Sequence, residues 1–150
     1  MYGAALQLVQ SSRLATIVTE EVYVEVWRLA PRYDPSESSV LAWMMAMAHR
    51  RSTDGVEATG RPASERHVAA NDQSDHVARH PDGSGHPHAE RARRALSAVR
   101  DPHRQAVVLA YFGECSQGEV ARIMELPVSQ VTTRIRNGLV GLRRELGVAT

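Results

Sequence analysis

The stretch Ser116–Leu146 reads SQGEVARIMELPVSQVTTRIRNGLVGLRREL, and it decides the fold of the C-terminal part of the chain. Ser116 and Glu119 have the spacing of a capping box, which begins a helix. Pro127 prevents that helix from continuing, and Ser129 can cap a second one. Two short helices joined by a tight turn are typical of a helix-turn-helix, whose second helix enters the DNA major groove. Nucleic acid is therefore the first partner that the sequence predicts.

The second helix has two distinct faces. Its apolar residues recur at helical spacing, so we expect them to pack inward: Val131, Ile135, Leu139, Leu142 and Leu146. The opposite face then carries side chains of the kinds that bind base edges and phosphates: Ser129, Gln130, Thr133, Arg136 and Asn137, with Arg134 at the flank. A solvated helix face is the alternative, and it is the one we favour for Arg143 and Arg144, together with phosphate contact.

Composition limits the class of protein. The chain has 150 residues and a net charge of +1, and all 18 basic residues are arginine. From Glu90 to Thr150 there are ten arginines against six acids, so the basic excess coincides with the predicted helix-turn-helix. A single cysteine, Cys115, excludes an internal disulfide and fits a reducing cytosol. No apolar run is long enough to cross a membrane, so we expect a soluble, cytoplasmic protein without membrane insertion.

Three blocks follow one another along the chain. Residues 1–54 are predicted to be helical, because Val18, Val22, Val26 and Leu29 recur at helical spacing and a second helix reads VLAWMMAMAHRR. Residues 55–88 contain HPDGSGHPH and no sustained period, which is typical of a flexible linker. Residues 89–150 are ordered again. The predicted fold class is all-α, with two small helical domains joined by the linker.

The third block also carries local signals before the helix-turn-helix. An arginine-rich helix is predicted from Ala89 to Val99. Asp101 and Pro102 then supply an N-cap and a first-turn proline for the helix HRQAVVLAYF, and Gly113 is placed to end it.

These segments resemble a known family, the extracytoplasmic-function (ECF) group of bacterial RNA polymerase sigma factors. HRQAVVLAYF, GEVARIM, PVSQVTTRI and LVGLRREL are similar to the family's C-terminal domain in that order. EEVYVEVWRLAPRYDP and LAWMMAMAHRRSTD are similar to its N-terminal domain. Together the two blocks cover about 90 residues on either side of the linker, counted from the quoted segments.

The resemblance implies partners and site residues. Core RNA polymerase and promoter DNA are the implied partners, an anti-sigma factor is a further one, and no cofactor is implied. The polymerase-binding residues would be Glu20, Glu21, Tyr23, Glu25 and Trp27. The residues that meet the melted minus-ten element would be Trp43, His49, Arg50 and Arg51. The residues on the minus-thirty-five duplex would be Ser129, Gln130, Thr132, Thr133, Arg134, Arg136 and Asn137.

The chain also departs from the family's pattern. In the family about 30 further residues precede the position of Tyr2, forming a helix against the docking helix. Ile17 stands where an acid is usual and Glu20 where a glutamine is usual. Glu57 and Thr132 replace basic residues, so we expect weaker DNA binding with a flatter salt dependence.

Other interpretations of these residues and of the chain's function stay open. Trp43, Met44, Met45 and Met47 suit a core, as flexible methionines often do. The histidines at 76, 80, 86 and 88 are expected to be solvated linker residues rather than metal ligands. The sequence contains no nucleophile, metal-ligand or phosphate-loop pattern, so we do not predict an enzyme. The alternatives to a sigma factor are a truncated remnant that binds an anti-sigma factor and a stand-alone helix-turn-helix regulator.

Overall fold

The computed structural model describes residues 1–58 and 87–147, and within these ranges the chain is helical without a strand. The all-α prediction is confirmed. The elements are α1 (Tyr2–Val9), α2 (Ser12–Leu29), a short 3-10 helix η1 (Ala30–Arg32), α3 (Val40–Ala58), α5 (Pro87–Ala98), α6 (Asp101–Phe112), α7 (Gln117–Ile123) and α8 (Val128–Glu145).

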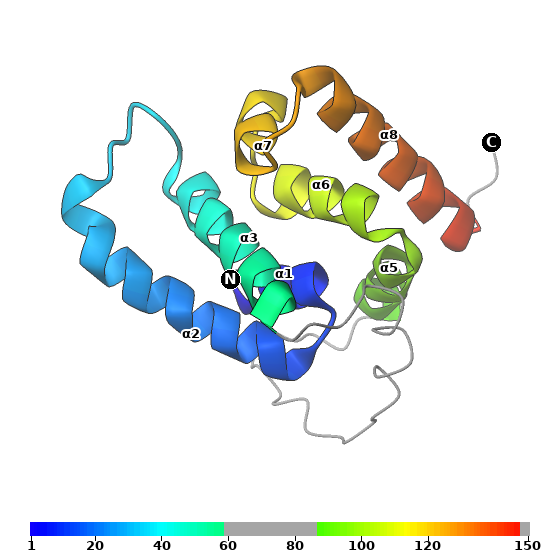
Figure 1. Ribbon diagram of the computed structural model, residues 1–150. Coiled ribbons are helices and arrows are strands. Elements are labelled where there is room, and N and C mark those ends of the chain that lie inside the picture. Colours follow the sequence, from blue (N-terminus) through cyan, green and yellow to red (C-terminus); the bar gives the residue numbers. More distant parts are fainter. Residues whose placement is uncertain (59–86, 148–150) are drawn as a thin grey trace.

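The N-terminal half consists of α1, α2 and α3. Ser11 caps α2, its hydroxyl accepting a hydrogen bond from the backbone N–H of Leu14. α2 and α3 pack along one another (Figure 1). Val22 of α2 is fully buried, as is Met45 of α3. The apolar face predicted for residues 18–29 therefore faces the core.

The C-terminal half is organised around α6, which packs against α7 and α8. Gly113 ends α6, as the sequence predicts. The predicted N-cap is wrong by one residue: Arg100 is the N-cap, and Asp101 is the first helical residue. Its carboxylate accepts a hydrogen bond from the guanidinium of Arg104 one turn later.

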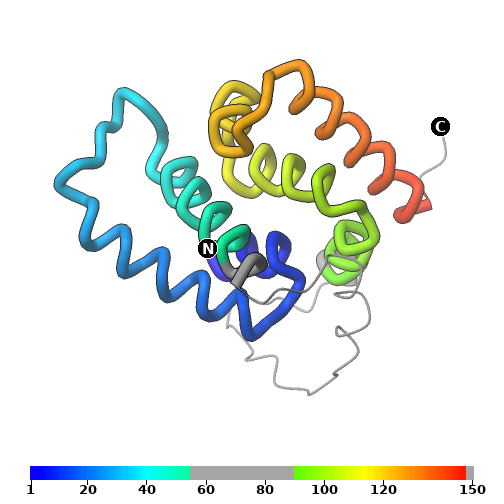
Figure 2. Tube along the Cα trace, in the orientation of Figure 1, coloured from blue at the N-terminus to red at the C-terminus, as the bar shows by residue number. Residues whose placement is uncertain are grey.

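The two halves also pack against each other. α1 lies against α6 and touches α5, while α3 touches α7. Figure 2 shows this path of the chain, with the dark blue α1 beside the green start of α6. The buried apolar side chains of both halves form one continuous cluster. The sequence predicts two separate helical domains, and this direct packing between them comes from contacts that no local pattern encodes.

Most of the predicted linker lies outside the described residues. Its first four residues, 55–58, belong to the end of α3, and residues 87–88 begin α5. The histidines at 76, 80 and 86 fall on residues 59–86, which the structure does not describe.

Candidate nucleic-acid interface

The first helix of the predicted helix-turn-helix begins with the capping box that the sequence indicates. The hydroxyl of Ser116 accepts a hydrogen bond from the backbone N–H of Glu119 at 3.2 Å. The Glu119 carboxylate in turn accepts the backbone N–H of Ser116 at 2.8 Å. The hydrogen bonds from the side chain and backbone of Ser116 lower the pKa of Glu119. The carboxylate therefore stays ionised and fixes where α7 begins.

The turn between α7 and α8 ends at a different N-cap from the one predicted. Glu125 has φ 54°, a left-handed conformation that favours glycine. α8 begins at Val128 with Pro127 as its N-cap, and no side chain caps it. The prediction that Ser129 caps this helix is wrong, because the carbonyl of Pro127 already accepts the N–H of Gln130 at 3.0 Å. Ser129 instead belongs to the first turn of α8.

The inner face of α8 is anchored by a valine and a glycine. Val131 is fully buried. Gly138 is also buried, and a Cβ there would lie 2.5 Å from Cγ2 of Val107 on α6, so the two helices approach too closely for a side chain. Ile135, Leu142 and Leu146 of the predicted inner face are half-buried.

The prediction that Leu139 belongs to the inner face is wrong, because its exposed fraction is 38%. The residue that α8 presses against α6 at this level is Gly138, one position earlier, and this turns Leu139 outward. The inward packing of α8 is therefore carried by Val131, Ile135 and Leu142 and by the close approach at Gly138.

The outer face of α8 points to solvent. Six of the seven residues predicted to bind the minus-thirty-five element are exposed, namely Ser129, Gln130, Thr132, Thr133, Arg136 and Asn137, and Arg134 is half-buried. Thr132 lies next to α7, and its hydroxyl donates to Oε1 of Gln117 at 2.8 Å. The face thus presents amides, hydroxyls and guanidinium groups together, in the arrangement that DNA-reading helices use.

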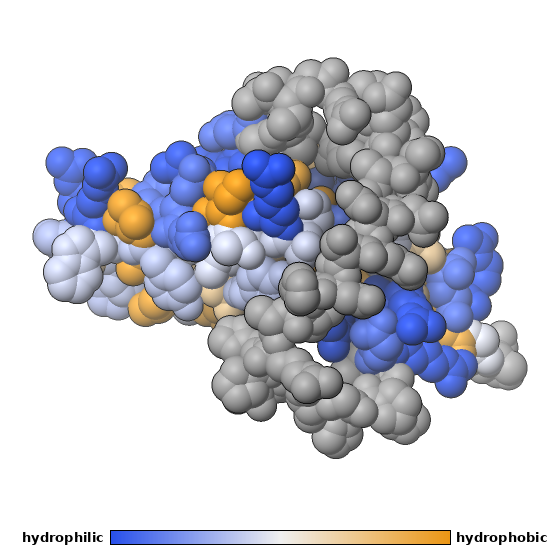
Figure 3. Space-filling view, turned by 90° about the horizontal axis from the view of Figure 1, so that it is seen from below, coloured by the Kyte–Doolittle hydropathy of each residue, from blue (hydrophilic) through white to orange (hydrophobic). Residues whose placement is uncertain are grey.

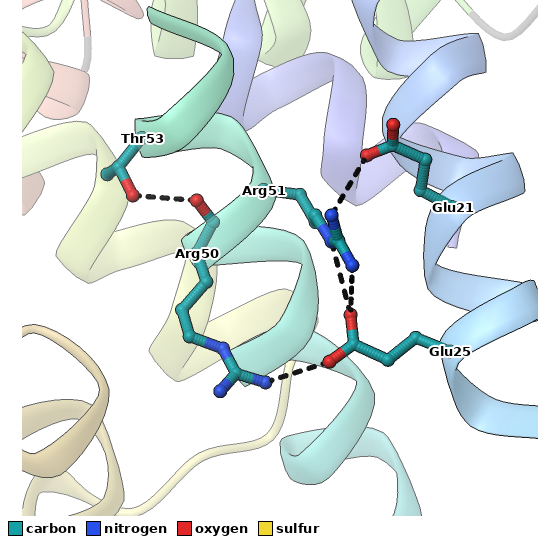
Figure 4. A network of polar contacts seen from close by, with 5 residues as sticks. All are labelled: Glu21, Glu25, Arg50, Arg51 and Thr53. Atoms are coloured by element: carbon teal, nitrogen blue, oxygen red, sulfur yellow. Dashed lines mark hydrogen bonds and ion pairs between the residues drawn. The ribbon is translucent and has the colours of Figure 1, made fainter. Parts of the chain in front are cut away.

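The arginines at positions 50 and 51 of α3 are already paired within the chain (Figure 4). Arg50 lies 3.2 Å from Oε1 of Glu25, and Arg51 lies 3.0 Å from its Oε2. Arg51 also approaches Glu21 at 3.8 Å. The network joins residues predicted to bind polymerase to residues predicted to bind DNA. Both side chains keep substantial exposure, 64% for Arg50 and 41% for Arg51, so phosphates can still reach them.

His49 faces the interior of the molecule. It is 8% exposed, and its Nε2 lies 3.3 Å from Oε1 of Gln105 on α6. Burial lowers the pKa of His49, while the hydrogen bond with Gln105 and the charge of Glu125 oppose that shift. Trp43, the remaining residue predicted for the minus-ten element, is half-buried and its ring packs 5.0 Å from that of Tyr33.

The outer face of α2 carries the remaining predicted polymerase contacts. Tyr23 is 54% exposed and Trp27 is 86% exposed, so neither forms part of the core. Glu20 is exposed on the same helix. Figure 3, which views the molecule from below relative to Figure 1, shows apolar side chains lying among hydrophilic ones. Tyrosine and tryptophan are enriched at protein–protein interfaces relative to the rest of a protein surface.

Arg104 is the residue that the sequence analysis missed. Its side chain is 3% exposed and lies between the two halves of the molecule. It donates from Nε to the carbonyl of Gln7 and from a terminal nitrogen to the carbonyl of Val99, each at 3.0 Å. The signal was a charge close to an apolar run, since Arg104 lies two positions before the stretch Ala106–Ala110 of α6.

The described residues hold no cluster of three histidine, cysteine or carboxylate side chains that could bind a metal ion. Cys115 is buried, and its burial raises the pKa of the thiol to about 11. A thiol with so high a pKa is a poor nucleophile near neutral pH. Among the helices described, none is long and apolar enough to cross a membrane.

Comparison with known proteins gives two matches to protein families. Residues 1–61 match the family model of Sigma-70 region 2, and residues 89–140 match that of Sigma-70 region 4. The chain is 34% identical over 152 aligned positions to the ECF RNA polymerase sigma factor SigK of Mycobacterium tuberculosis, covering 99% of this chain and 81% of the relative. It is 36% identical to SigK of Mycobacterium ulcerans, covering 95% and 78%.

A solved structure has the same fold. It is the sigma factor RpoE from Bartonella quintana, in complex with the anti-sigma factor NepR. The TM-score is 0.74 at 18% sequence identity, and the match covers 99% of this chain and 91% of the other.

Proposed function

This chain belongs to the ECF group of RNA polymerase sigma factors, and we propose that its two halves divide the recognition of a promoter between them. Sigma factors of this group direct RNA polymerase to promoters and regulate transcription. In the proposal, residues 89–150 bind the minus-thirty-five duplex through α8. Residues 1–54 bind the melted minus-ten strand and core polymerase, and residues 55–88 link the two.

The observation that supports this division most is the outer face of α8. Val131 and Gly138 fix the opposite side of the helix against the domain, so rotation about the helix axis is prevented. Gln130, Thr133 and Arg136 are then held outward on a rigid element. Side chains of these types, fixed on the N-terminal half of a helix after a tight turn, suit direct contact with base edges.

The surface proposed for core polymerase is the outer face of α2. Trp27 is the most exposed large apolar residue there, and tryptophan is enriched at the energetic centre of protein interfaces. Glu20 and Tyr23 flank it. Glu21 and Glu25 face α3 and hold the arginines in place, so in this proposal they act on polymerase through the exposed edges of the same network.

Linking two weak binding sites explains how modest contacts reach a useful affinity. Once one half is bound, the other half is confined near its own target. Its binding then depends on a high local concentration rather than on the concentration of the protein in solution. The substitution of Thr for a cation at position 132 weakens one half, and this linkage compensates for it. We also propose that the chain acts in the cytoplasm, performs no covalent chemistry and needs no cofactor.

Holoenzyme formation tests the proposal. The complete chain is mixed with purified core RNA polymerase of Mycobacterium tuberculosis and passed over a size-exclusion column, and run-off transcription is then measured on promoter fragments selected from genomic DNA. We expect comigration and promoter-dependent transcripts. Trp27→Ala should abolish comigration, while Tyr2→Phe, a matched aromatic change on α1, should leave it intact.

Two alternatives give different outcomes in the same assay. The relative RpoE is known in complex with an anti-sigma factor. A chain that only sequesters such a factor would bind it and fail to join core polymerase. A stand-alone regulator would bind duplex DNA without polymerase and show no transcription. Either result would replace the sigma-factor proposal.

A further inference from the structure

A groove lies between the beginning of α6 and the C-terminal half of α8. The two helices run in opposite directions, which brings these ends together (Figure 1). The groove has a volume of about 490 Å³. Arg100 and His103 line it from the side of α6, and Asn137 and Arg144 line it from α8. It therefore combines open space with side chains that can bind an anion, and of these four only Asn137 is among the residues predicted to bind DNA.

The two walls of the groove are held at a fixed separation. At Gly138 a Cβ would lie 3.0 Å from the carbonyl oxygen of His103, so the backbones of α8 and α6 approach closely beside the groove. Gly141 lies one turn further along α8, and a Cβ there would lie 3.4 Å from Cγ2 of Val99. A ligand between the walls would therefore meet donors whose positions are set before it binds, and this lowers the entropy cost of binding.

Arg100 gives the groove a positive charge that no carboxylate there cancels. Its side chain is exposed. The carboxylate of the next residue, Asp101, is bonded to Arg104. Glu145, which also lines the groove, pairs with Arg144 at 3.1 Å. Because both carboxylates are engaged with other guanidinium groups, the charge of Arg100 remains available to an anion in the groove.

Asn137 joins the groove to the outer face of α8. It is exposed, it belongs to the residues proposed for the minus-thirty-five duplex, and it lines the groove. Asn137, Val140 and Arg144 follow one another at spacings of three and four residues, so they continue the side of α8 that carries Thr133. The major groove is about 12 Å wide, so a helix that reads base edges has a sugar-phosphate backbone close by on each side. A duplex bound by α8 therefore brings phosphates to the edge of this groove.

We propose that the groove binds a backbone phosphate of the minus-thirty-five duplex, with Arg100 supplying the positive charge and His103 and Asn137 supplying N–H donors. Phosphate contacts of this kind fix where the duplex lies on the protein and do not read its sequence. The beginning of α6 is then a second DNA-binding element beside α8. This site rests on the proposed function, because it requires that α8 binds a duplex.

Arg100→Gln tests the charge of the site. The side chain of Arg100 makes no capping hydrogen bond at the beginning of α6, so glutamine should leave the helix intact. Arg93→Gln is the matched control, because Arg93 lies on α5, outside the lining of the groove, with its guanidinium 3.7 Å from Glu90. Both variants lose one positive charge, so an effect of net charge alone is the same in both.

Fluorescence anisotropy measures the affinity of the complete chain for a duplex selected from random DNA by that chain, and for an unrelated duplex of the same length. We expect Arg100→Gln to weaken binding about five- to tenfold on both duplexes. The slope of log affinity against log salt concentration should become shallower by about 0.9, the amount for one phosphate contact. Arg93→Gln should keep the wild-type slope, and its affinity should stay within about twofold of wild type, since distant charges are screened.

Neutral phosphate analogues locate the contact on the DNA. Methylphosphonate groups are placed one at a time along both strands of the selected duplex. One position, at the edge of the bases whose substitution affects binding, should weaken the wild type about five- to tenfold. The same position should leave Arg100→Gln almost unchanged, because one partner of the contact is already missing. It should still weaken Arg93→Gln, and its effect should be reduced in His103→Gln.

Equal affinities and equal salt slopes for the wild type and Arg100→Gln would overturn the phosphate site. The α8 interface would survive that result if Arg136→Ala still weakened duplex binding. Equal losses in Arg100→Gln and Arg93→Gln at every methylphosphonate position would assign the effect to net charge and would also overturn the site. Circular dichroism checks that the variants fold, and His103→Gln carries the same test if Arg100→Gln does not. A wild-type chain that binds no duplex at all would reject the site together with the proposed function.

Discussion

The ring nitrogen Nε2 of His49 and the amide oxygen of Gln105 lie 3.3 Å apart, and they belong to residues 56 positions apart in the chain. The ring is buried where α3 meets α6. A neutral imidazole satisfies this contact by donating its N–H to the amide oxygen. A charged imidazolium would have to lose its hydration there.

His49 should make stability depend on pH. Its pKa is lowered in the folded state, and its ordinary value is 6.5. The contribution of neutral His49 is therefore fully present above pH 6.5 and is lost as the pH falls through the folded pKa, because the unfolded chain binds the proton first. Urea unfolding at about pH 7.5 and pH 5.5 measures this loss. His49→Gln should reduce it; an equal loss in both proteins would assign the pH dependence to other groups.

Gly138→Ala should destabilise the C-terminal half. The added Cβ would lie 2.5 Å from Cγ2 of Val107 and 3.0 Å from the carbonyl oxygen of His103, so α8 must shift away from α6. Overpacking of this kind costs about 1 to 3 kcal/mol. Gly118→Ala on α7 is the matched control, because nothing lies within 4 Å of its Cβ position. Thermal unfolding should lower Tm for the first variant only; equal Tm values would mean that the helices adjust freely.

Arg136→Ala should weaken duplex binding by about 1 to 3 kcal/mol if the guanidinium reads a base with two hydrogen bonds. Arg136 is exposed on the outer face of α8. Arg144→Ala is the control on the same helix, since Arg144 lies near its end and pairs with Glu145 at 3.1 Å. Fluorescence anisotropy with a DNA duplex selected from random sequences by this chain measures the duplex affinity of both variants. A loss that is the same for both variants and for all sequences would indicate phosphate contact alone.

Glu125→Gly should stabilise the turn of the helix-turn-helix. A residue with a side chain at φ 54° carries a conformational cost that glycine avoids, and the gain is reduced by the greater freedom of glycine in the unfolded chain. We expect a net gain of up to about 1 kcal/mol in urea unfolding. Glu37→Gly, in a turn without positive φ, should give no gain. Glu125→Asn tolerates the same backbone and separates this effect from loss of charge.

The helix-turn-helix was predictable because its signals are local. Ser116 and Glu119 are three residues apart, so short-range chemistry sets where α7 begins, and Pro127 prevents one continuous helix from running through to α8. The outward face of α8 followed from helical spacing. Leu139 was misplaced because the spacing cannot show which turn of α8 approaches α6 most closely, and that is determined by the missing side chain of Gly138.

The packing of the two halves could not be predicted in the same way. Arg104 and Gln7 are 97 positions apart, and neither belongs to a motif that points to the other. His49 looked like a helix-end cation suited to DNA, yet its burial depends on where α6 lies. Contacts of this kind arise from the three-dimensional arrangement of helices, and for Arg104 the only trace in the sequence is a charge two positions before an apolar run.

The pairing of Glu25 with Arg50 and Arg51 has a consequence for how this protein responds to ionic strength. When these arginines move to a DNA backbone, each exchanges a carboxylate for a phosphodiester, and Glu25 must take up a cation from solution. Part of the counterion release that normally drives DNA binding is thereby cancelled. The α3 end of the molecule is thus buffered against changes in salt, while α8 has no such internal anion beside Arg136 among the contacts of its described residues.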